Sequence, residues 1–138
     1  MIHLIYVSSA TKEMSEDELL FLLEQSRARN ERQNVTGMLL YGGGNFIQVL
    51  EGSEKDVDEI YKAIKGDERN KGNIVIEKSE ITERTFPDWS MGFKHLARRD
   101  RSNIRGYTEF LERRMEPHEF TNKKDHVVDL LYKIKEYL

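Results

Sequence analysis

VTGMLLYGGGNFIQVLE, residues 35–51, is the stretch that decides the fold of this chain. Two apolar runs flank three consecutive glycines, and glycine permits the positive φ angles that a tight connection between strands requires. We therefore predict two strands, Val35 to Tyr41 and Asn45 to Glu51, joined as a β-hairpin.

A strand and a helix precede this hairpin. Residues 2–7 are rich in β-branched and aromatic side chains, which predicts a strand buried on both faces. Ser15 and Glu18 have the spacing of a capping box, so a helix is expected to begin there and to end near Asn30.

A second helix and two more strands follow the hairpin. Ser53 is a typical N-cap residue, and Gly66 stands where that helix should stop. The pattern then predicts strands from Ile74 to Ile81 and from Trp89 to Leu96, the latter after a turn at 86–88. The order βαββαββ predicts an α+β, ferredoxin-like sandwich, with two helices packed on one face of a mixed sheet.

The C-terminal region continues the helical pattern beyond the predicted sheet. Residues 101–115 and 123–138 both have helical periodicity, which predicts a C-terminal two-helix extension covering the second face of the sheet. We accordingly divide the chain into a core at 1–97 and an extension at 98–138, with the boundary at the basic stretch 98–101.

Composition excludes several classes of function. The 138 residues are 38% apolar, enough for one hydrophobic core, and the formal net charge of -3 disfavours direct binding of nucleic acid or an anionic membrane. No apolar run approaches the roughly 18 residues of a membrane span, and no signal peptide is apparent, so a cytoplasmic location is expected.

Cysteine and histidine content narrows the chemistry further. The chain has no cysteine, which excludes disulfides, thiol nucleophiles and any adduct between a cysteine and a cofactor. The four histidines are far apart and lack the spacing of metal ligands, so we expect no metal site.

Polar residues on faces that periodicity marks as buried are the candidate site. Ser26 and Asn30 continue the apolar stripe of the first helix, Gln48 lies between Phe46 and Leu50, and Tyr6 shares a face with apolar neighbours. A buried polar group without a hydrogen-bond partner costs roughly 1–3 kcal/mol. Each is readily explained alone as a core residue bonded to backbone, but together they predict one pocket.

The position of that pocket follows from the expected topology. Strands one and three are commonly neighbours in such a fold, with the first helix above them, so Tyr6, Gln48 and Asn30 are expected to converge. The predicted apolar walls include Val35, Phe46 and Leu50. An apolar pocket with a few polar groups suits a planar heteroaromatic ligand.

Five short blocks in these same regions carry a family resemblance. They are IYVSSA at 5–10, SRARN at 26–30 with VTG at 35–37, FIQVLEG at 46–52, DER at 67–69 and WSM at 89–91. Together they resemble the successive signatures of BLUF domains, which are flavin-binding blue-light photoreceptors. The resemblance extends over residues 2–96, and the tail is similar to the two-helix extension of short, stand-alone members.

The resemblance implies roles for individual residues. Asn30 is expected to bind the polar edge of the isoalloxazine ring, and Gln48 to lie between the ring and Tyr6. Ser26 and Asp67 are expected to help hold the flavin, with Asp67 near the ribityl chain. The other positions assigned to cofactor binding are Ser8, Val35, Phe46, Leu50 and Arg69.

Two further residues complete the expected photoswitch. The resemblance implies that Trp89 and Met91 occupy the fifth strand beside Gln48, and period-2 spacing puts both on one face with Phe93. Asn70 stands where the family often has histidine, a departure that concerns the phosphate-facing end of the cofactor. FAD is the expected cofactor, with FMN as the alternative.

The expected function is therefore light sensing without enzymatic turnover. Electron and proton transfer from Tyr6 through Gln48 is expected to leave the glutamine rotated or tautomerised and donating to the flavin C4 carbonyl, which shifts absorption slightly to the red. The signal is expected to pass through the fifth strand and the C-terminal helices to a separate effector protein or to self-assembly, with a homodimer favoured. Alternative interpretations are a ferredoxin-like metabolite-binding module or an acylphosphatase-like hydrolase.

Overall fold

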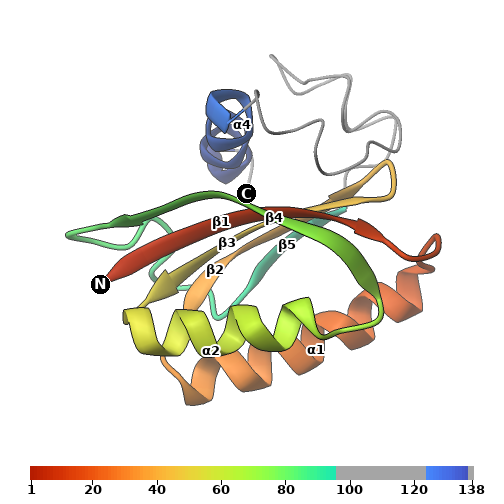
Figure 1. The fold of residues 1–138 in the computed structure, drawn as a ribbon, viewed down its shortest axis with the longest axis horizontal. Helices are drawn as coiled ribbons and strands as arrows, with labels where there is room; N and C mark the ends of the chain where they lie inside the picture. The colour runs from red at the N-terminus through yellow and green to blue at the C-terminus, as the bar shows by residue number, and fades with distance from the viewer. Residues whose placement is uncertain (96–123, 137–138) are drawn as a thin grey trace.

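The computed structural model describes residues 1–95 and 124–136 and shows one five-stranded sheet between two helical layers (Figure 1). The strand order is β4-β1-β3-β2-β5, in which only β2 and β5 pair in parallel. The strands are β1 Ile2–Ala10, β2 Thr36–Gly42, β3 Asn45–Gly52, β4 Asn70–Glu80 and β5 Gly92–His95; the helices are α1 Glu16–Arg32, α2 Glu54–Lys65 and α4 Lys124–Glu136. The predicted α+β class with a mixed, ferredoxin-like sheet is confirmed.

Local signals in the sequence locate the helix ends well. The Ser15 hydroxyl accepts from the Glu18 backbone N–H at 3.2 Å, and the Glu18 carboxylate accepts from the Ser15 N–H at 3.1 Å, which is the predicted capping box. Ser53 caps α2, and Gly66 ends it. Helix α1 runs on to Arg32, past the predicted end near Asn30.

The β2–β3 hairpin forms around its glycines as predicted. Gly43 and Gly44 have φ angles of 59° and 79°, a backbone conformation that other residues adopt only with strain. This two-residue connection brings Gly42 opposite Asn45 and, further along, Leu39 opposite Gln48. The hairpin therefore sets the position of Gln48 in the sheet.

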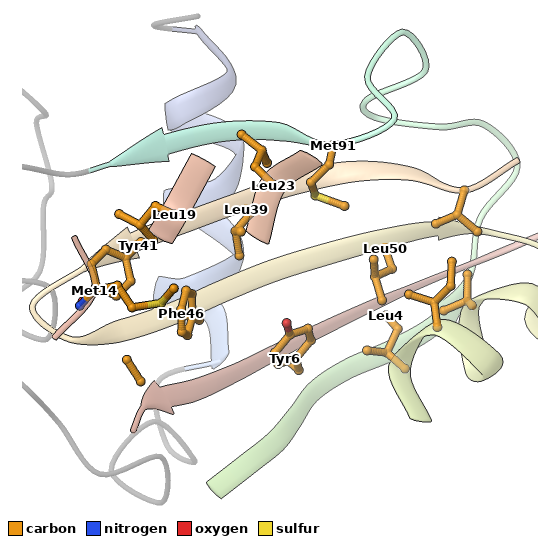
Figure 2. Close-up of a cluster of buried hydrophobic side chains, with 14 of the residues drawn as sticks. Leu4, Tyr6, Met14, Leu19, Leu23, Leu39, Tyr41, Phe46, Leu50 and Met91 are labelled. Carbon is orange, nitrogen blue, oxygen red and sulfur yellow. The ribbon is translucent and has the colours of Figure 1, made fainter. Parts of the chain in front are cut away.

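Two apolar clusters lie on opposite faces of the sheet. Helices α1 and α2 cover one face, and α4 lies against the other (Figure 1). The pocket-side cluster, partly drawn in Figure 2, includes Leu4, Tyr6, Leu19, Leu23, Leu39, Phe46, Leu50 and Met91. The α4-side cluster includes Ile5, Val7, Leu40, Ile47, Val49, Phe86, Val127, Leu130 and Leu131.

The C-terminal region is described only in part. Val127, Leu130 and Leu131 of α4 are buried against the sheet, so this part of the helix packs within its own chain. The helix predicted at 101–115 and the boundary predicted near 98 lie outside the described residues, and the division into two units stays a prediction. Among residues 1–95 and 124–136, no helix has the length and apolar character needed to span a membrane.

The predicted fifth strand needs correction. It was expected from Trp89 to Leu96, but β5 begins only at Gly92, so Trp89 and Met91 precede it. Trp89 packs in the α4-side cluster, where its ring stacks on Phe86, whereas Met91 is buried in the pocket-side cluster. The prediction that both share one face is wrong, because the alternation of side chains applies only within a regular strand.

Candidate functional site

A pocket opens between α1 and α2, above the centre of the sheet. The strands supply its floor, and the turn after α2 closes one side. Its lining consists of Tyr6, Leu39, Phe46 and Gln48 from the strands, Leu22, Gln25, Ser26 and Arg29 from α1, and Ile64, Asp67, Arg69 and Asn70 from α2 and beyond. Five apolar or aromatic residues and seven polar or charged ones make up this lining, which suits a ligand with an apolar body and several polar groups.

Tyr6 and Gln48 form a hydrogen-bonded pair on the pocket floor. They are direct partners in the β1–β3 register, and the Tyr6 hydroxyl donates to Gln48 Oε1. Both side chains are almost fully buried, and Figure 2 shows Tyr6 among the apolar residues of this face. Burial, reinforced by nearby Tyr61, raises the pKa of Tyr6 well above its ordinary value, so the phenol keeps its proton.

The other end of the Gln48 amide contacts Met91. Gln48 Nε2 donates to Met91 Sδ at 3.2 Å, and the whole contact is buried. A thioether is a weak acceptor, so the amide is held firmly at its oxygen and weakly at its nitrogen. Hydrogen bonds therefore connect Tyr6, Gln48 and Met91 in one buried series.

Three buried polar atoms in the described part of the chain have no protein hydrogen-bond partner: Ser8 Oγ, Arg29 Nε and Asn30 Oδ1. Arg29 lines the pocket, and Ser8 and Asn30 are buried on the same side of the sheet without lining it. Buried polar atoms are nearly always paired, so these three atoms indicate a polar ligand edge. Arg29 offers a donor, Asn30 an acceptor and Ser8 both. This set fits a flavin, whose ring edge carries carbonyl acceptors and an N–H donor.

Arg29 is the most informative residue that the sequence reasoning missed. It lines the pocket, and burial is the main cause that lowers the pKa of its guanidinium. Leu22, Ser26 and Arg29 lie at i, i+4 and i+7 along α1, so helical spacing contained the signal. The prediction instead followed the stripe to Asn30. Gln25 and Leu39 are the other lining residues that were missed.

Asp67 and Arg69 form an ion pair at the pocket. Arg69 donates through Nε to the Asp67 carboxylate at 2.9 Å and through its terminal nitrogen at 2.5 Å, and it also reaches Gln25 at 2.8 Å. This hydrogen bonding is the main cause that lowers the pKa of Asp67. Asn70 lines the pocket too, but its amide nitrogen donates to the backbone carbonyls of Ile64 and Asp67 and ties down the end of α2.

The structure brings most of the predicted site residues together. Those that line the pocket are Tyr6, Ser26, Phe46, Gln48, Asp67 and Arg69. Those that are buried on the same side without lining it are Ser8, Asn30, Val35, Leu50 and Met91. Trp89 alone lies on the opposite face of the sheet. Their roles toward a cofactor stay predictions.

The chain is similar to proteins of known family. The family model described as "Sensors of blue-light using FAD" matches residues 1–92. The photoactivated adenylate cyclase subunit alpha of Euglena gracilis is 38% identical over 86 residues, which are 62% of this chain and 8% of that protein. A beta-like subunit from the same organism is 33% identical over 89 residues, or 64% of this chain and 10% of the relative.

Solved structures agree with these matches. The dark-state structure of BlrB, a BLUF protein, has a TM-score of 0.80 at 28% identity and covers 99% of this chain and 96% of its own. A bacterial light-regulated adenylyl cyclase has a TM-score of 0.77 at 31% identity, with 96% of this chain and 40% of that one covered. The chain thus spans about a tenth of the curated cyclase relatives that it matches.

Proposed function

The chain belongs to the BLUF family, the blue-light sensors that use FAD, and on that premise we propose that Tyr6 and Gln48 are its hydrogen-bond switch. A blue-light photoreceptor with a flavin chromophore is the function that this family membership establishes. The metabolite-binding and hydrolase alternatives are therefore set aside. The observation that carries the proposal is the buried bond from the Tyr6 hydroxyl to Gln48 Oε1 on the pocket floor.

A flavin bound here supplies absorption of blue light and, once excited, an acceptor for an electron. Tyr6 is the donor in this proposal because it lines the pocket and its hydroxyl already directs its proton at Gln48. The raised pKa of Tyr6 keeps that proton in place in the dark. Electron loss makes the phenol strongly acidic, so the proton leaves toward the Gln48 oxygen.

Gln48 stores the response in the geometry of its amide. The oxygen and nitrogen ends are nearly identical in shape, so rotation or tautomerisation changes the hydrogen bonds without repacking the buried surroundings. The bond to Met91 Sδ is the weak one, which leaves the nitrogen end free to exchange partners. The ground state returns thermally, with no net chemistry.

The cofactor is held by side chains from α1, β1, β3 and the turn after α2. Asn30, Arg29 and Ser8 supply the buried polar atoms for the ring edge, and Ser26 and Asp67 border the pocket next to them. Val35, Phe46 and Leu50 provide apolar packing. Arg69 lies beside Asp67 and is suited to the outer end of the cofactor, which we take to be FAD rather than FMN, as in the family description.

The proposal also covers how the light signal is passed on. Curated relatives are photoactivated adenylate cyclases, so in those proteins a sensor of this kind occurs together with an enzyme. For this chain we infer a sensor without turnover of its own, located in the cytoplasm, that signals to an effector protein or through a homodimer. Light scattering at micromolar concentration, in light and in darkness, tests the dimer, and a monomer mass in both would contradict it.

Two variants test the switch. Gln48→Leu removes every hydrogen-bonding atom at similar volume, and Tyr6→Phe removes the phenolic proton at nearly constant shape. Both should bind flavin, remain yellow and lose the persistent red shift after blue light. In Tyr6→Phe the excited flavin should also survive longer, because its main electron donor is absent.

Tyr41→Phe is the matched control. Tyr41 is also a buried tyrosine of the pocket-side cluster, but its hydroxyl accepts from the Met14 backbone N–H and does not line the pocket. This variant should keep the full red shift. A complete, reversible red shift in flavin-loaded Gln48→Leu or Tyr6→Phe would show that the proposed switch is wrong.

A further inference from the structure

The segment between β4 and β5 is tied to its surroundings by three consecutive backbone carbonyls. The Trp89 carbonyl accepts from the Gly37 backbone N–H of β2 at 3.0 Å. The Ser90 carbonyl accepts from Asn30 Nδ2 at 2.9 Å, and the Met91 carbonyl accepts from Arg27 Nε at 2.9 Å. Helix α1 therefore holds the backbone of Ser90 and Met91, which sets the position of the Met91 side chain.

A second attachment holds the start of this segment. The buried Glu51 carboxylate accepts from the backbone N–H groups of Thr85 and Phe86 at 2.7 and 2.8 Å. Arg84 in turn donates to the Thr36 hydroxyl and to the Glu51 and Asn34 carbonyls, all at 2.8 Å. With both ends attached, the segment has little freedom to move Met91 except by releasing the bonds to α1.

Among these bonds, the one from Arg27 can be removed without touching the pocket. Asn30 is itself a proposed flavin ligand, and Gly37 cannot be changed because a Cβ there would lie 1.9 Å from the Val49 carbonyl oxygen. The Arg27 side chain is exposed apart from its contact with Met91, and it does not line the pocket. Its contact with the segment is separable from cofactor binding.

We propose that Arg27 is a positioning residue of the photoswitch, which holds the Met91 carbonyl so that Sδ stays against Gln48 and thereby sets the lifetime of the lit state. This inference rests on the proposed switch at Tyr6 and Gln48. In the dark arrangement Gln48 Nε2 donates to Met91 Sδ. When the amide rotates so that its oxygen, and no longer its N–H, points at the sulfur, the Gln48 oxygen and Met91 Sδ face one another across this buried contact. Both atoms are hydrogen-bond acceptors.

The attachment by Arg27 then prevents Met91 from moving away. The lit state retains an unfavourable contact, and relieving it favours return of the amide to its dark orientation. If the Arg27 bond is removed, the Met91 carbonyl loses its donor while Ser90 stays bonded to Asn30 and Trp89 to Gly37. Met91 itself can then shift, the lit state relaxes and its decay slows. Arg27 therefore favours fast recovery without contacting the chromophore.

The test compares Arg27→Ala and Arg27→Leu with the parent protein, loaded with flavin. The leucine variant retains apolar packing but has no N–H donor, so agreement between the two assigns the effect to the bond. We expect the red shift to form fully in both and to decay roughly threefold to tenfold more slowly, as expected for one lost hydrogen bond. Arg32→Ala removes the same charge from the exposed end of α1 and should recover at the parent rate.

A second readout does not depend on light. With ¹³C at the methionine carbonyls, the infrared spectrum of the dark protein should contain one band that disappears in Met91→Leu. That band should move to higher frequency in Arg27→Ala and Arg27→Leu, because the carbonyl loses its donor, and should stay in place in Arg32→Ala.

The proposal requires both results. An unmoved band, or a moved band with recovery at the parent rate, overturns it. The red shift itself tests a different claim: its absence in the parent protein would overturn the switch at Gln48, whereas its presence with unchanged recovery in the Arg27 variants would overturn only the role of Arg27.

Discussion

The two faces of the sheet are built from the same strands but differ in character. On β1 and β3, Tyr6 and Gln48 face the pocket, while their neighbours Val7 and Ile47 face α4. In the described part of the chain, the three buried polar atoms without a protein partner, on Ser8, Arg29 and Asn30, all lie on the pocket side. Along each of these strands, one residue lines the pocket and the next packs in the apolar core against α4.

Met91 and Trp89 show the same contrast outside the regular strands. They are two residues apart, yet Met91 contacts Gln48 in the pocket-side cluster and Trp89 stacks on Phe86 at 5.7 Å between ring centroids on the other side. Substitutions on the two faces should therefore change different properties, and the following predictions test this separation.

The largest effect on stability is expected on the α4 side. Ile47→Ala deletes apolar volume from a side chain with no exposed surface, and should lower the free energy of unfolding by about 2–5 kcal/mol. The folded fraction should still bind flavin and give the full red shift, which chemical denaturation and absorption spectra can measure. A lost or altered red shift in folded protein would show that the faces are not independent.

The next effect is expected on cofactor affinity. Asn30→Ala removes a buried acceptor proposed to bind the ring edge, and should weaken flavin binding by about 1–3 kcal/mol, or roughly fivefold to 150-fold. Flavin titration of the apoprotein measures it. Gln33→Ala, which changes a residue bonded to Glu59 outside the pocket, is the control, and equal affinity for all three proteins would exclude this role.

Alkaline pH should destabilise the protein through the pocket side. The pKa of Tyr6 is raised in the folded state, so above the ordinary tyrosine pKa of about 10 the unfolded chain loses this proton more easily than the folded protein does. The free energy of unfolding should therefore be independent of this group below about pH 10 and should fall as pH rises above it. One such group contributes a slope of at most about 1.4 kcal/mol per pH unit. Denaturation at several pH values should show a smaller slope in Tyr6→Phe, and an identical slope would contradict the burial effect.

The smallest effect separates Trp89 from Met91. Trp89→Phe should cost about 1 kcal/mol of stability and leave the recovery rate unchanged, because this ring packs on the α4 side. Met91→Leu keeps its volume but removes the sulfur that Gln48 Nε2 contacts, so it should alter recovery. Recovery after a blue-light pulse distinguishes them, and a larger change in Trp89→Phe would reverse their proposed roles.

Much of the site was predictable from the sequence because it lies on regular elements. Tyr6 and Gln48 were assigned to one buried face by period-2 alternation, and the strand register makes them direct partners. Ser26 and Asn30 followed from helical spacing on α1. Arg29 was missed although it shares the helical spacing of Leu22 and Ser26, because a long cation on such a stripe can still extend into solvent, whereas here its Nε is buried.

The sequence by itself determined the first four strands, the capped helices, the glycine hairpin and the face that each regular residue occupies, because local backbone geometry repeats every 2 or 3.6 residues. Only the tertiary structure decided which side Trp89 and Met91 take. The residues that precede β5 have no such repeat, and their course depends on donors far away in the chain, Gly37 on β2 and Arg27 and Asn30 on α1. The position of Met91 against Gln48 is therefore a product of packing between distant segments.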